Sequence, residues 1–148
     1  QKGYDFLKKH PLDERIMNAA LMHHERCDGS GYPQGLKADE IDDFAKIVAI
    51  ADYYDALTSA RVYREPHCPF EVLRMLQQER DKFDSPYLAV FMEGVASFYI
   101  GCEVVLSNQK RARMVDTNPT DQSNPIVKMD GLIVDLAMAP DVDVKEIC

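Results

Sequence analysis

Two adjacent histidines and a carboxylate, in the stretch His23-His24-Glu25, are the residues of this sequence best suited to chemistry. Residues 28–33 follow closely and read Asp-Gly-Ser-Gly-Tyr-Pro. Imidazole and carboxylate groups together suit iron, manganese, zinc or nickel. Glycine has no Cβ, so a glycine-rich turn can approach a bound group closely. The pattern predicts metal ligands beside a ligand-binding loop, although a helix end with surface histidines and an ordinary turn has the same local composition.

A helix over about residues 13–26 is expected to present the histidines. Its apolar positions recur at helical spacing and place His23 on the inward stripe with Ile16 and Ala20. His24 is then about 100° further round the helix. Two neighbours on a regular helix do not easily chelate one ion. They would serve two ions, or one would serve after the helix unwinds toward Asp28.

A carboxylate further along the chain, Asp52, indicates the same chemistry. Residues 39–58 have helical periodicity, and we expect Asp39 or a neighbour to cap this helix. Its expected buried stripe consists of Ile41, Ala45, Val48, Asp52, Asp55 and Ala56. A buried carboxylate is costly unless it is paired or binds a metal. Asp52 is therefore either a metal ligand or the partner of a buried arginine or lysine, and periodicity does not separate the two.

The remaining periodicity is helical up to about residue 100 and strand-like after it. Pro69 suits the first turn of one helix, and Ser85-Pro86 suits the N-cap and first turn of another. Short strands are expected at 103–107, 111–115, 126–129 and 132–135. Asp130-Gly131 is a hairpin signal, and the polar segment 116–125 is expected to be a mobile loop. The predicted fold is mainly α, with a helical bundle over residues 1–100 and a small antiparallel β subdomain over 101–148.

The composition excludes several classes of protein. At 148 residues, of which 46% are hydrophobic, the chain suits one domain or a domain with a small appendage. A net charge of −8 argues against binding to nucleic acid polymers. No apolar run approaches the roughly 18–20 residues that cross a membrane. The four cysteines form no C-x-x-C motif, which favours reduced thiols and a cytoplasmic location.

The ordered motifs at 23–33, 47–59 and 61–64 closely resemble the HD-GYP family. Its members are metal-dependent phosphodiesterases of the HD superfamily that hydrolyse the bacterial second messenger cyclic di-GMP. The resemblance covers about residues 3–140 and implies the C-terminal part of an all-helical HD-type domain. It implies that His23, His24 and Asp52 are ligands of divalent ions, iron, manganese or similar, with two or three ions in the intact domain.

The resemblance also implies roles around the metals. Gly31, Tyr32 and Pro33 would line the substrate site, and Arg61 and Arg64 would contact the phosphates, which the planar guanidinium fork suits. For the arginines, a solvated helix end is the alternative. Behind the ligands, the resemblance implies supporting positions for Glu25, Asp28 and Asp55.

One departure from the family limits what this chain is expected to do. The His-Asp dyad that defines the family is absent and would lie upstream of Gln1, so we expect a piece of a longer protein. Three ligands are too few for a closed octahedral site. Unless a second copy supplies ligands, we expect weak or no metal affinity and no turnover by these 148 residues alone. Apolar surface left by the absent helices is expected to favour homodimers.

Three other interpretations remain open. The domain could be a non-catalytic sensor or docking module that binds a signalling partner, such as a diguanylate cyclase domain, through the Gly-Tyr-Pro loop. It could be an HD hydrolase that acts on a different nucleotide. The third is an unrelated zinc site formed by His23, Cys27, His67 and Cys68.

Overall fold

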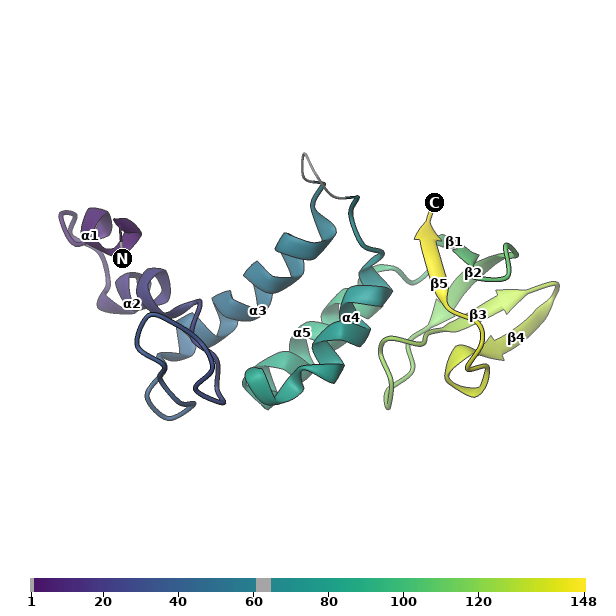
Figure 1. The fold of residues 1–148 in the computed structure, drawn as a ribbon. Coiled ribbons are helices and arrows are strands. Elements are labelled where there is room, and N and C mark those ends of the chain that lie inside the picture. The colour runs from purple at the N-terminus through teal and green to yellow at the C-terminus, as the bar shows by residue number, and fades with distance from the viewer. Residues whose placement is uncertain (1, 61–64) are drawn as a thin grey trace. The chain divides into compact units, whose positions relative to one another are not determined.

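Helices precede a β-sheet in the computed structural model, which describes residues 2–60 and 65–148 (Figure 1). In this part of the chain the α-helices are α1 (Lys2–Leu7), α2 (Glu14–Met22), α3 (Asp43–Thr58), α4 (Pro69–Gln78) and α5 (Ser85–Phe98). The strands are β1 (Glu103–Leu106), β2 (Arg111–Asp116), β3 (Ile126–Met129), β4 (Leu132–Asp135) and β5 (Val144–Ile147). The predicted order of helices and antiparallel strands is confirmed. The sheet is larger than predicted, so helix and sheet both contribute substantially to the fold.

Helix α2 is shorter than the sequence pattern predicts. It begins after Asp13, whose side chain accepts a hydrogen bond from the backbone N–H of Arg15, and it ends at Met22 with His23 as C-cap. Within the described residues, α2 has no buried side chain, and Ile16 is 47% exposed. The predicted inward stripe of this helix is therefore wrong. The helix stops before Glu25 because that side chain turns into the interior to bind the following loop.

The predicted buried stripe of helix α3 is only partly right, because Ile41 and Ala45 are buried but Val48, Asp52 and Asp55 are exposed. Asp42, and not Asp39, caps the helix, since its Oδ1 accepts a hydrogen bond from the N–H of Phe44 at 2.9 Å. The buried positions near its start are Ile41, Ala45, Ala49 and Ile50. Ile41, Ala45 and Ala49 advance by four residues per step, and Val48 and Asp52 lie on the neighbouring row. Both are exposed, so the prediction that Asp52 is buried is wrong.

The described chain divides into two compact units. One contains the chain up to Ala56 together with Glu79–Ala89, and the other contains Leu57–Gln78 and Val90–Cys148. The core of the first consists of Ile41, Ala45, Ala49, Ile50, Phe83 and Leu88. These bounds do not coincide with the change of periodicity near residue 100, because α4 and most of α5 belong to the unit that contains the sheet.

In the second unit, α4 lies against a five-stranded sheet of order β4-β3-β2-β1-β5, in which all neighbouring strands are antiparallel. Its largest buried side chains are those of Phe70, Leu73, Leu76, Leu106, Met114 and Leu136. The predicted Asp-Gly hairpin joins β3 to β4, and Asp130 and Gly131 both have positive φ, as a type I′ turn requires. Strand β5 was not predicted, and it pairs with β1.

The ends of α4 and α5 follow local signals closely. Helix α4 begins at Pro69, as predicted. The N-cap of α5 is Asp84, one residue earlier than predicted, since its carboxylate and its carbonyl accept from the N–H groups of Tyr87 and Leu88. No helix in the described residues combines the length and the apolar character that crossing a bilayer requires.

Candidate active site

His23 and His24 lie at the end of α2 with their rings 4.1 Å apart. The Nδ1 atom of His23 is 2.9 Å from the backbone carbonyl oxygen of Ala19. A carbonyl oxygen can only accept, so Nδ1 carries the proton and donates it. This hydrogen bond orients the ring and leaves the Nε2 lone pair available to a metal ion, an arrangement that supports metal-binding histidines in proteins.

His24 stacks on the side chain of Tyr32, with ring centroids 4.8 Å apart and planes inclined by 23°. Burial lowers the pKa of His24, and the neighbouring His23 lowers it further, while the carboxylate of Asp52 acts in the opposite direction. A lowered pKa favours the neutral imidazole at pH 7, which is the form that binds metal ions. Asp52 is thus electrostatically linked to His24 although it is exposed.

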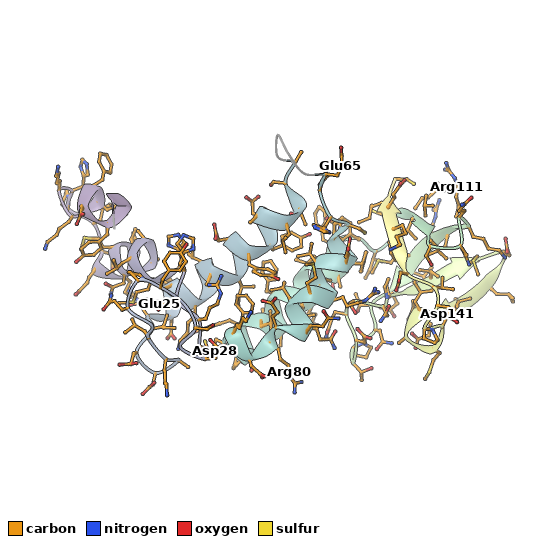
Figure 2. The ribbon with its side chains drawn as sticks, viewed as in Figure 1. Glu25, Asp28, Glu65, Arg80, Arg111 and Asp141 are labelled. Carbon is orange, nitrogen blue, oxygen red and sulfur yellow. The ribbon has the colours of Figure 1, made fainter. Side chains whose placement is uncertain are left out.

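Glu25 binds the loop that follows the histidines. Its side chain is 2% exposed, and its two carboxylate oxygens accept hydrogen bonds from the backbone N–H groups of Gln34, at 2.7 Å, and Leu36, at 3.0 Å. Figure 2 shows Glu25 and Asp28 on the segment between α2 and α3. Hydrogen bonds to an ionised acceptor are stronger than neutral ones. Glu25 therefore holds the Gly-Tyr-Pro loop against the end of α2.

Gly31 allows this loop to pack on the backbone of the preceding turn. A Cβ at Gly31 would clash with the backbone nitrogen of Arg26 and with the Cα of Glu25, so no larger residue fits. The N–H of Tyr32 then donates to the carbonyl of His24 at 3.2 Å. The peptide bond between Tyr32 and Pro33 is cis. Tyr32 is 60% exposed, and its ring offers an open aromatic surface beside the imidazole of His24.

Asp28 shapes the turn at the start of the same loop. Its Oδ1 accepts hydrogen bonds from the N–H and the Oγ of Ser30, at 2.9 and 2.6 Å, and these bonds lower its pKa. Asp55 lies about one helical turn beyond Asp52 on α3 and is exposed. That Asp28 and Asp55 support or orient the metal ligands stays a prediction. Arg61 and Arg64 lie outside the described residues.

No three His, Cys, Asp or Glu side chains in the described part of the chain are placed to hold a metal ion together. His23 and Cys27 belong to the first unit, and His67 and Cys68 belong to the second, so a zinc site from these four residues stays a prediction. The chemistry of His23 and His24 fits a metal, because the hydrogen bond of His23 uses Nδ1 and not Nε2, and the lowered pKa of His24 favours its neutral form. Asp52 does not complete a group of three with them, so the assignment of His23, His24 and Asp52 as ligands stays a prediction.

Arg26 is a residue of this site that the sequence reasoning missed. Its Nη1 donates to the carbonyl oxygens of Glu25, at 2.8 Å, and His23, at 3.3 Å. Its guanidinium carbon lies 5.2 Å from the centre of the Phe83 ring. The available signal was a cation at the end of a predicted helix, where free backbone carbonyls attract one.

An HD domain family model matches residues 1–86, which is more than half of the chain. The chain belongs to the HD domain family. This confirms the recognition made from the motifs, and the matched range includes the histidine pair, the Gly-Tyr-Pro loop and helix α3.

Several known phosphodiesterases are similar in sequence to more than half of this HD domain chain. Cyclic di-GMP phosphodiesterase PA4108 of Pseudomonas aeruginosa is 31% identical over 114 residues, which are 77% of this chain and 28% of that protein. A cyclic di-GMP phosphodiesterase of Thermotoga maritima is 49% identical over 76 residues, 51% of this chain and 21% of that protein. The 3′3′-cGAMP-specific phosphodiesterase 1 of Vibrio cholerae is 42% identical over 112 residues, 67% of this chain and 26% of that protein. The chain thus spans less than a third of the length of these relatives.

Proposed function

We propose that this HD domain is part of a metal-dependent phosphodiesterase that hydrolyses cyclic di-GMP in bacterial signalling. The observation that carries the proposal is the stack of Tyr32 on His24, held by the bonds from the loop to Glu25. It sets an exposed aromatic ring beside His24, whose other neighbour is His23, and such a surface suits a nucleotide base next to a phosphate. Relatives that bear the name cyclic di-GMP phosphodiesterase support the substrate.

The residues of this chain would bind and orient the substrate. The open face of Tyr32 would stack against guanine or ribose, as aromatic rings do with bases. Arg61 and Arg64 would neutralise phosphate oxygens in pairs. His23 and His24 would offer imidazole nitrogens to iron, manganese or a similar ion. When bound, such ions lower the pKa of a water molecule and polarise phosphoryl oxygens.

The chain alone is proposed to be inactive, because its described donors do not close a metal site. The test compares the full-length protein with residues 1–148, each incubated with cyclic di-GMP and Mn²⁺ or Fe²⁺. We expect linear dinucleotide or GMP from the full-length protein and none from the shorter chain. Full-length His24→Ala is the control for contaminating nucleases. A full-length protein that has metal bound and forms no product would refute the proposed activity.

A second candidate substrate is 3′3′-cGAMP. The observation that favours it is the 42% identity to a relative named as specific for that dinucleotide, over two thirds of this chain. Measuring kcat/KM for both dinucleotides in the same preparation separates the candidates. A higher value for 3′3′-cGAMP would replace cyclic di-GMP as the proposed substrate.

A non-catalytic docking role is the remaining alternative, and the exposure of Tyr32 favours it. In that case a diguanylate cyclase domain, or another signalling partner, would bind the Gly-Tyr-Pro loop. Titrating such a domain with wild-type and Tyr32→Ala protein tests this role. A dissociation constant that Tyr32→Ala leaves unchanged would exclude docking through the loop.

A further inference from the structure

Three consecutive backbone carbonyls follow the last turn of α2, at His23, His24 and Glu25. Carbonyls at the end of a helix have no partner within the helix, so they must find donors elsewhere. The carbonyl of His24 accepts from the N–H of Tyr32. The other two both accept from one guanidinium nitrogen, Nη1 of Arg26. One side chain thus holds the turn from which both imidazoles extend.

The guanidinium of Arg26 is itself held in place by the core of the first unit. It lies over the ring of Phe83, which is buried and makes an edge contact with Tyr53, centroids 5.3 Å apart. Tyr53 follows Asp52 on α3. The backbone next to Arg26 is anchored at the same place, because the N–H of Cys27 donates to the carbonyl of Lys82 at 2.9 Å. Arg26 therefore connects the histidine turn to Phe83, which in turn contacts the helix that carries Asp52.

The contacts of Arg26 are those of a backbone clamp and not of an ion pair. In the described residues no carboxylate lies within 4.0 Å of its guanidinium, whereas Arg15 and Arg74 each pair with an aspartate. Arginine suits this task because a single planar group can donate several hydrogen bonds while its face rests on an aromatic ring.

We propose that Arg26 is a positioning residue that sets the placement of His23 and His24 through their backbone. The placement of the two histidines by Arg26 rests on geometry alone. An effect of Arg26 on catalysis would rest on the proposed function. Loss of the clamp would release the carbonyls of His23 and Glu25. The His24 ring would then lose its stacked position on Tyr32, although the fold would persist.

The test compares Arg26→Met, Arg26→Lys and the control Arg80→Met in residues 1–148 by NMR. Met keeps an unbranched apolar side chain but cannot make either hydrogen bond to the carbonyls, whereas the Lys ammonium still donates. Arg80, labelled in Figure 2, has a largely exposed side chain, so its loss makes the same change in net charge at the surface. The probes are the nuclear Overhauser effect between the His24 and Tyr32 rings and the methyl signals of the buried Ile41 and Ile50.

We expect Arg26→Met to lose the effect between the two rings with the Ile41 and Ile50 signals unchanged. Arg26→Lys should keep most of the nuclear Overhauser effect between the two rings, and Arg80→Met should give the same effect as the wild type. Retention of the effect in Arg26→Met would overturn the proposal. So would its loss together with altered Ile41 and Ile50 signals, since that outcome assigns Arg26 to stability alone. No turnover is needed, so absent hydrolysis of cyclic di-GMP would count only against the proposed function.

Discussion

Glu25 is the buried charge on which the geometry of the Gly-Tyr-Pro loop depends. In Glu25→Gln the amide oxygen can still accept one N–H, but the amide nitrogen then faces the other N–H, and one bond is lost. Leaving a buried donor unpaired costs about 1–3 kcal/mol. We expect this fall in the free energy of unfolding, measured by urea denaturation, and faster hydrogen exchange at Gln34 and Leu36.

Glu40→Gln is the matched control for that substitution. Glu40 is exposed and accepts only one backbone N–H among the described residues, that of Lys37. Its substitution should change the free energy of unfolding by no more than about 0.5 kcal/mol. Equal losses in the two variants would mean that the bonds to Glu25 do not hold the loop.

Gly31 and Gly94 provide a second contrast between two single positions. An Ala Cβ at Gly31 would meet backbone atoms that cannot move aside, so Gly31→Ala should destabilise the chain by about 1–3 kcal/mol. Gly94 lies inside α5, where an added Cβ would point into open space among the described residues, and Gly94→Ala should stabilise the chain by about 1 kcal/mol. Thermal unfolding measures the change in stability of both variants. A Gly31→Ala variant that is more stable than the wild type would contradict the packing described for the loop.

Among the elements, the loop between β2 and β3 differs most from its prediction. Its polar sequence predicts a mobile loop, yet hydrogen bonds of the buried Asn118 side chain fix its conformation. The Oδ1 of Asn118 accepts from Thr120 and from the N–H of Asp121, and its Nδ2 donates to Asp135. Arg74 on α4 reaches the same loop by donating to Asn124 at 3.2 Å. The polar side chains of this loop therefore do not indicate mobility, because they form hydrogen bonds within the loop and to neighbouring elements.

Asn118→Ala should consequently destabilise the unit that contains the sheet. It removes an acceptor of several hydrogen bonds and a donor to the half-buried Asp135, at a total cost of about 1–3 kcal/mol. Asn108→Ala is the control, because Asn108 is exposed and its side chain accepts from the N–H of Lys110 at the surface. Urea denaturation of both variants tests this, and a neutral Asn118→Ala would show that the loop does not depend on that side chain.

Across the whole molecule, the thiols provide a test of which regions are closed to solvent. Burial raises the pKa of Cys27 and of Cys68, whereas Cys148 is exposed. The thiolate is the nucleophile, so a raised pKa reduces the reactive fraction near neutral pH. Iodoacetamide followed by mass spectrometry should label Cys148 well before Cys27 and Cys68. In guanidinium chloride, where the chain is unfolded, the three cysteines should be alkylated at similar rates. Similar alkylation rates in the native chain would contradict the described burial.

The association into homodimers inferred from the sequence stays a prediction. Large apolar side chains are exposed on several elements, among them Phe44 on α3, Val90 and Phe98 on α5, and Leu132 and Ile133 on β4. Exposed apolar surface of this kind favours association. Size-exclusion chromatography with light scattering measures the mass, and a monomer at all concentrations would contradict the prediction.

The order of elements, the start of α4 at Pro69 and the Asp130-Gly131 hairpin followed from the sequence, because each depends on residues a few positions apart. The family also followed from it, since the motifs are local and ordered. The exposure of Asp52, the early end of α2 and the pairing of β5 with β1 depended on tertiary structure. Each is set by groups distant in the sequence: the row of α3 that packs inward, the amides that Glu25 binds, and a strand edge far upstream. Periodicity reports which residues can share a face, and only packing decides which face is buried.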